Sequence, residues 1–167
     1  MKAFLFLAAG LALTAFALPA QAQSDDTKTF VEKAGLSNLY EIRAGEIALG
    51  RTRRDDVRQF AQMMIDEHTK AGNDLKKALA ISPQPPDVPE VLDNDRQEKI
   101  NDLRKADTED FDKEYIAAQT DAHEEAVSLF EDYAENGDDP ALREFAANTL
   151  PALRQHERRI KKMAKSD

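Results

Sequence analysis

A group of four prolines between residues 82 and 89 divides this chain of 167 residues into two parts and limits the folds open to it. Proline lacks a backbone N–H and fixes φ, so this stretch cannot be helical and is expected to be an extended connection. On each side of it lie two long segments in which apolar residues recur at helical spacing. Glycine occurs only six times and runs of β-branched residues are few, which disfavours a sheet. The sequence therefore predicts an all-α fold.

The first half of the chain contains two of these segments. Residues 26–51 carry small side chains such as Gly45 on their apolar face, which lets a partner helix approach closely there. The second segment begins at Thr52, where the pattern Thr-Arg-Arg-Asp has the form of a capping box. Its apolar stripe continues to about residue 79, so the two segments predict two helices joined by a short turn.

The second half contains the other two. A long helix is predicted over residues 108–136, with Thr108 as its N-cap. The last helix is expected to follow Asp139 as N-cap, because Pro140 then occupies the first helical position, where its missing N–H costs nothing. A shorter helix is predicted near residues 95–105, inside the long connection between the two halves.

Four long helices with two short turns and one long crossover predict a ferritin-like four-helix bundle, with the short helix in the crossover between the second and third long helices. A simple up-down-up-down bundle is the alternative topology. The length suits one domain with a substantial core.

The first 22 residues have the form of a signal peptide. Met1-Lys2 is a basic start, residues 3–18 are apolar and uncharged, and the small residues Ala20 and Ala22 suit cleavage before Gln23. The apolar run has sixteen residues, whereas a membrane-spanning helix needs about 20. We therefore expect residues 1–22 to be removed and residues 23–167 to form a single domain in a bacterial periplasm.

Composition excludes several classes of function. The formal net charge of −9 argues against a nucleic-acid partner, because there is no basic surface to displace phosphate counterions. The absence of cysteine removes thiolate nucleophiles, iron–sulfur clusters and cysteine-based zinc sites. No segment after the leader is expected to insert stably into a membrane. A second copy of the chain or an envelope protein remains an open class of partner.

The residues most suggestive of chemistry are the three histidines, His68, His123 and His156, which fall on the apolar stripes of three different helices. Glu41 lies on the apolar side of the remaining long helix. At about 1.5 Å per residue, each of these lies roughly 18–25 Å from a helix end, near the middle of a helix ~40 Å long. One carboxylate and three imidazoles, one from each helix, are therefore expected to converge on the bundle axis.

Such a group suits a single divalent ion, because imidazole binds Zn, Cu, Fe and Mn and a carboxylate adds compensating charge. Met64, one turn before His68, adds a soft thioether that favours copper. The alternative is a metal-free network in which Glu41 is hydrogen-bonded to one or more protonated histidines. Both remain open from the sequence alone.

A di-iron centre is not expected. Such centres use Glu-x-x-His twice, which places both ligands on one helix face. The residues three positions before the histidines are Ile65, Thr120 and Leu153, so the motif is missing at all three. The sequence also has no glycine-rich phosphate loop and no G-x-S-x-G motif, and it leaves open whether the protein is an enzyme.

Four stretches resemble, in order, the bacterial family catalogued as domain of unknown function 4142. They are YEIRAGEIALG, VRQFAQMMIDEHTKAGNDL, FDKEYIAAQTDAHEEAVSLFE and LREFAANTLPALRQHERRI. The resemblance covers about Phe30 to Met163 and implies a ferritin-like fold and export, since members are often labelled membrane or outer-membrane proteins. The family pattern has an acidic residue at Glu41, Asp/Glu-His at Glu67-His68, and histidines at positions 123 and 156.

From these observations the leading hypothesis is an exported bundle that binds one divalent metal through Glu41, His68, His123 and His156, for metal handling or an envelope stress response. The alternative is a metal-free structural or interaction protein of the cell envelope, whose acidic surface would carry the function.

Overall fold

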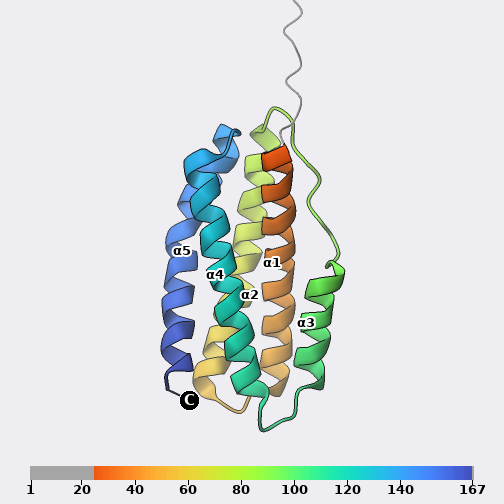
Figure 1. Cartoon of the computed structure of the whole chain (residues 1–167), viewed down its shortest axis with the longest axis vertical. Helices are drawn as coiled ribbons and strands as arrows, with labels where there is room; N and C mark the ends of the chain where they lie inside the picture. The colour runs from red at the N-terminus through yellow and green to blue at the C-terminus, as the bar shows by residue number, and fades with distance from the viewer. Residues whose placement is uncertain (1–24, 167) are drawn as a thin grey trace, which may run out of the picture.

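The computed structural model describes residues 25–166, so the predicted leader lies outside the described range (Figure 1). This range contains five α-helices and no strand: α1 (Asp25–Arg51), α2 (Asp55–Ile81), α3 (Asn94–Lys105), α4 (Phe111–Asn136) and α5 (Pro140–Ala164). The all-α prediction is confirmed. None of the helices in residues 25–166 has an apolar stretch long enough to cross a membrane.

The four long helices form two antiparallel hairpins, α1 with α2 and α4 with α5, packed side by side (Figure 1). Helix α1 contacts α4, and α2 contacts α5, so each long helix has two neighbours around the bundle axis. The segment between α2 and α4 contains α3 and returns the chain along the bundle to the end where α1 finishes (Figure 1). As a result α2 and α4 run in the same direction.

Two helix starts differ from the predictions. The N-cap of α2 is Arg54 rather than Thr52, and the Thr52 hydroxyl oxygen accepts a hydrogen bond from the backbone N–H of Arg54 at 3.1 Å. Thr52 therefore closes the turn before the helix instead of capping the helix. Helix α4 begins later than predicted, with Asp110 as N-cap, because Thr108 lies in a turn in which Asp110 donates to the Asp107 carbonyl at 3.2 Å.

The prediction for the start of α5 is confirmed. The Asp139 carboxylate accepts hydrogen bonds from the backbone N–H groups of Ala141 and Leu142 at 2.9 and 3.1 Å, and Pro140 follows it directly. The other carboxylate oxygen of Asp139 accepts from the Ser82 hydroxyl at 2.5 Å. One side chain thus caps α5 and joins it to the end of α2.

The contact between α1 and α2 is close at Gly45. A Cβ atom on Gly45 would lie 2.8 Å from a side-chain carbon of Ile65 and 3.0 Å from the carbonyl oxygen of Ala61. Because real Cβ atoms are not found so near other atoms, only glycine fits here without a shift of α2. This agrees with the close approach expected from the small residues of the first segment.

Helix α3 is held against the end of α1 by apolar and polar contacts. Ile100 and Leu103 are buried against the bundle. The Arg51 guanidinium donates to the Arg104 carbonyl at 2.8 Å, at the end of α3, and its carbon lies 4.7 Å from the centre of the Phe111 ring. Arg51 therefore supplies a cation where the α3 carbonyls have no helical partner.

The bundle interior has two apolar parts with polar side chains between them. The upper apolar core includes Phe30, Leu75, Ala126, Phe130, Tyr133, Leu142 and Leu153. The lower apolar core includes Tyr40, Val57, Phe60, Met64, Phe111, Ile116 and Ile160. Between these two cores, along the bundle axis, lie five buried polar residues that we call the polar layer: Glu41, His68, Gln119, His123 and His156. The layer is formed by all four long helices.

Candidate metal centre

The structure brings the three histidines together in the polar layer. His68 comes from α2, His123 from α4 and His156 from α5, and their exposed fractions are 5%, 1% and 3%. The ring centroids are 5.4 to 5.9 Å apart. One ring nitrogen of each histidine lies within 4.8 Å of the corresponding nitrogens of the other two. Three potential ligand atoms thus share one small space in the bundle.

In each ring one nitrogen already has a hydrogen-bond partner, and every partner is an oxygen. The pairs are His68 Nδ1 with Asn38 Oδ1 at 3.2 Å, His123 Nδ1 with the Gln119 carbonyl at 2.8 Å, and His156 Nε2 with Glu67 Oε2 at 2.7 Å. A carbonyl or carboxylate oxygen can only accept, so these nitrogens carry the ring hydrogen. In the neutral ring, the other nitrogen then has a free lone pair.

The other nitrogens are buried and have no partner among the described residues: His68 Nε2, His123 Nε2 and His156 Nδ1. A buried polar atom without a hydrogen bond costs roughly 1–3 kcal/mol, and native proteins leave few of them. Here there is one on each ring. Three converging lone pairs that accept no hydrogen bond from the described residues are the arrangement that a cation requires.

The surroundings favour the uncharged form of His68 and of His156. Burial holds the pKa of His68 well below its usual value, and the nearby His123 and His156 lower it further. Burial also lowers the pKa of His156, followed by the effect of His123, although the Glu67 carboxylate opposes this. Because neutral imidazole is the form that binds a metal ion, the site favours the ligand form of these two side chains.

Glu41 lies beside this group but outside it. Its Oε1 is 3.8 Å from His123 Nδ1, the nitrogen that carries the ring hydrogen, and its side chain is only 2% exposed. Burial raises the pKa of Glu41, and His123 opposes that shift. The carboxylate, predicted to be a fourth ligand, lies on the Nδ1 side of His123 and is not part of the group of three converging nitrogens, but it is close enough to offset positive charge on that ring.

Three groups behind the rings were not found as site residues from the sequence: Asn38, Glu67 and the Gln119 carbonyl. The carbonyl of Gln119 comes from the turn before His123, so only the helix itself provides it. Glu67 precedes His68 in the chain but bonds to His156, 89 positions away. The family resemblance includes an acidic residue at position 67 but assigns no role to it. A pattern of neighbouring residues could not show this contact, because it joins two different helices.

The arrangement fits the dimensions of a metal site with a small adjustment. Three imidazole nitrogens around zinc, at about 2.0–2.1 Å from the ion, are about 3.3 Å apart in tetrahedral geometry. Starting from separations within 4.8 Å, each nitrogen would have to move inward by less than about 1 Å. Each ring is also oriented by an oxygen on its far nitrogen, as metal-binding histidines usually are.

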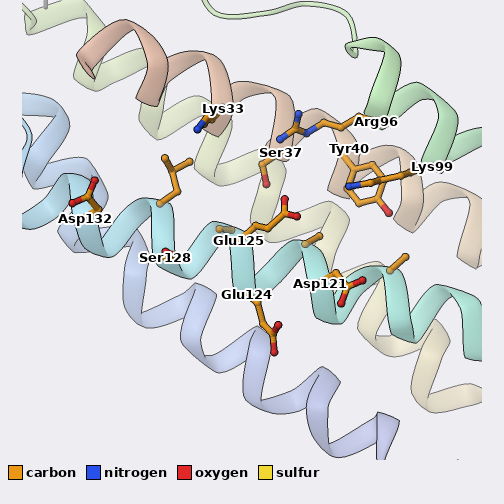
Figure 2. Close-up of a pocket in the computed structure, with 14 residues that line it drawn as sticks. Lys33, Ser37, Tyr40, Arg96, Lys99, Asp121, Glu124, Glu125, Ser128 and Asp132 are labelled. Carbon is orange, nitrogen blue, oxygen red and sulfur yellow. The ribbon is translucent and has the colours of Figure 1, made fainter. Parts of the chain in front are cut away.

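Two long grooves formed by the described residues differ in whether they reach the histidines. The groove between α1, α3 and α4 has Lys33, Arg96 and Lys99 on one side and acidic residues of α4 such as Asp121 and Glu125 on the other (Figure 2). None of the three histidines lines it. The groove between α2 and α5 is lined by His68 and His156, together with Glu67. Of these two grooves, the one between α2 and α5 therefore lies next to the histidines.

Comparison with known proteins places the chain in a family. Searches of the curated proteins and of the solved structures found no match. The profile of the family described as Domain of unknown function (DUF4142) matches residues 13–163, which is most of the sequence and includes all residues of the polar layer. The chain therefore belongs to the DUF4142 family.

Proposed function

We propose that this protein binds one divalent transition-metal ion through His68, His123 and His156. The observation that carries the proposal is that each ring donates its N–H to an oxygen and leaves its other nitrogen buried and unpaired among the described residues. A metal ion would satisfy all three nitrogens at once. It would also offset the cost of burying them.

The donor set narrows the choice of ion. Three neutral imidazoles suit Zn²⁺ and Cu²⁺ best, because affinity for nitrogen ligands rises along the first row to copper, and Fe²⁺ and Mn²⁺ bind more weakly. Two carboxylates lie behind the rings, Glu41 near His123 and Glu67 against His156. Their negative charge would offset part of the charge of the ion and strengthen the ring nitrogens as donors.

The proposed setting is the periplasm, where the protein would serve metal handling or an envelope stress response. The form of residues 1–22 supports export, and the resemblance of the chain to proteins labelled as envelope proteins agrees with it. In this setting a buried site with one ion per chain suits storage, transfer or protection rather than bulk deposition.

The test is the metal content of the untagged mature protein, residues 23–167, purified without chelator and then equilibrated with Zn²⁺, Cu²⁺, Fe²⁺ or Mn²⁺. We expect about one ion per chain in the native protein and a loss of binding in His68→Ala and His123→Ala. Met64→Leu is the matched control, because Met64 is buried on the same helix as His68 and the exchange nearly conserves volume. This control should keep the ion, and its loss would indicate a thioether ligand.

Thermal unfolding with and without chelator is a second test of metal binding at this site. An ion that binds only the folded state adds about 2.7 kcal/mol of stability at 100 times its dissociation constant. If no ion is taken up and chelator has no effect, the proposal is wrong. The polar layer would then be a metal-free network, and the function would belong to the surface of an envelope interaction protein.

A further inference from the structure

The groove between α1, α3 and α4 has two walls of opposite charge (Figure 2). One wall comes from α1 and α3 and carries three cations: Lys33, Arg96 and Lys99. The other wall is α4, which carries four carboxylates: Asp121, Glu124, Glu125 and Asp132. The groove has a volume of about 1130 Å³, at the upper end of the range for small-molecule sites, and none of the proposed metal ligands lines it.

The two walls do not neutralise each other. Arg96 and Lys99 pair with aspartates at the start of α3, at 2.7 and 3.2 Å. On α4, Glu124 pairs at 2.7 Å with Lys161, which does not line the groove. Among the described residues, no ion pair joins a cation of the first wall to a carboxylate of α4. A simple anion or a simple cation in the groove would therefore meet one favourable and one unfavourable wall.

Tyr40 adds a buried polar group that has no partner. Its side chain lines the groove from α1 (Figure 2). The residue is only 3% exposed, and its hydroxyl makes no hydrogen bond with any described residue. Burial raises the pKa of Tyr40, and three nearby carboxylates raise it further: Glu41, Asp121 and Glu125. The hydroxyl therefore keeps its hydrogen and can donate it to an acceptor in the groove.

The lining also includes an apolar stripe on α4. Its residues lie three or four positions apart and so share one face of the helix: Ala118, Ala122, Ala126 and Leu129. Asp121 and Glu125 each directly precede one of these alanines, so the carboxylates lie along the edge of the stripe. Apolar surface thus accompanies the charged groups in the same groove.

We propose that this groove binds a small zwitterion with an apolar body, the class to which free apolar amino acids and short peptides belong. Its carboxylate lies against Arg96, Lys99 and the Tyr40 hydroxyl. Its ammonium group lies against Asp121 and Glu125, and its apolar body covers the stripe on α4. Only a molecule with both charges matches both walls, and its carboxylate gives the buried hydroxyl an acceptor. The inference is independent of the proposed metal site, which lies next to the other groove.

The test is a titration of the metal-free mature chain, residues 23–167, with L-leucine and with L-leucyl-L-leucine, followed by the NMR chemical shifts of the backbone amides. We expect saturable shifts in α3 and in the part of α4 that lines the groove. Two analogues of leucine each lack one charge: 4-methylpentanoate has no ammonium group, and 3-methylbutylamine has no carboxylate. Each should bind at least tenfold more weakly than leucine, because each matches only one wall. The tighter of the two zwitterions identifies the site as one for amino acids or for peptides.

Two variants with a matched control locate the site. Tyr40→Phe should weaken leucine binding about tenfold, because it removes one hydrogen bond to a charged group. Tyr115→Phe is the control, since Tyr115 is also buried with an unpaired hydroxyl but does not line the groove. Asp121→Asn changes an exposed residue of α4 and should weaken the binding of leucine but not of 4-methylpentanoate.

Three results would overturn the inference: no shifts with either zwitterion, analogues with one charge that bind as tightly as leucine, or equal affinities of the Tyr40→Phe and Tyr115→Phe proteins. Because the titration uses metal-free protein, none of these results bears on metal binding by the histidines.

Discussion

The upper apolar core and the polar layer are equally buried, but they differ in whether their buried polar atoms have hydrogen-bond partners. In the upper core, Phe30 stacks on Tyr133 with centroids 3.9 Å apart, and the Tyr133 hydroxyl is paired with Thr27 at 2.6 Å. In the polar layer, His68 on α2 and His123 on α4 each leave a ring nitrogen without a partner among the described residues. The upper core thus gives its buried tyrosine a polar partner, and the layer does not do the same for these rings.

The difference shows which region stabilises the fold. Aromatic burial with a satisfied hydroxyl contributes to stability in the upper core. Unpaired imidazole nitrogens and a buried carboxylate work against stability in the layer. Sites that break the rules of packing in this way are often functional, and the layer is where three such nitrogens lie close together, which is the physical reason to look for a ligand there.

The largest expected effect comes from exchanging one side chain in each region. Phe30→Ala should lower the free energy of unfolding of the metal-free protein by about 3–5 kcal/mol, because it removes a fully buried ring and leaves a cavity. His68→Leu should change it by less than about 1.5 kcal/mol, because it removes an unpaired nitrogen together with one hydrogen bond. Urea unfolding of both variants measures these energies.

Metal binding should show the reverse order. His68→Leu should abolish it, whereas Phe30→Ala should keep one ion per chain under conditions where the variant is folded. If His68→Leu costs as much stability as Phe30→Ala, the layer is part of what holds the bundle together. The contrast between the two regions would then be wrong.

Much of the fold could be predicted from the sequence because its signals are local. Helical spacing and proline positions are properties of neighbouring residues, and the Asp139-Pro140 start of α5 was found for that reason. The starts of α2 and α4 were predicted at the wrong residues. Thr52 and Thr108 are residues of a type that commonly caps helices, but here they lie in the turns before the helices. A capping pattern does not show which residue the turn geometry places at the helix start.

Of the candidate site, only the three histidines could be predicted from the sequence. The three histidines lie near the middle of three helices, on the apolar faces that pack into the bundle interior. The structure brings them together there. The residues behind the rings depend on the rotation of each helix and on which ring nitrogen faces which neighbour. Those are properties of the packed bundle, which is why the sequence did not show that Glu41 approaches the Nδ1 side of His123 or that Glu67 contacts His156.

The next largest effect concerns Glu67, whose side chain is 45% exposed and pairs with the buried His156. Glu67→Gln should weaken metal binding about 10- to 100-fold, the usual cost of losing a carboxylate behind a histidine ligand. Glu131→Gln is the matched control, because Glu131 is similarly exposed at 42% and pairs with Arg154 on α5. Calorimetric titration with Zn²⁺ should separate them, and equal affinities would show that Glu67 does not act on the site.

The smallest expected effect is the pH dependence of the metal-free protein. The pKa values of His68 and His156 are lowered in the folded state, so below about pH 6.5 the unfolded chain takes up protons that the folded chain does not. Stability should therefore be unaffected by these two residues above that pH and should fall as the pH decreases towards their folded pKa values. The slope is at most about 1.4 kcal/mol per pH unit for each histidine.

Glu41 acts in the opposite direction, because its raised pKa lets the folded protein hold a proton that the unfolded chain has lost. The measurement is therefore made in a Glu41→Gln background, by urea unfolding between pH 7.5 and 5.5. Adding His68→Leu should flatten the pH dependence, whereas adding Phe30→Ala should lower stability equally at every pH, since no titrating group is changed. If both additions leave the same slope, the polar layer does not govern the acid sensitivity of this bundle.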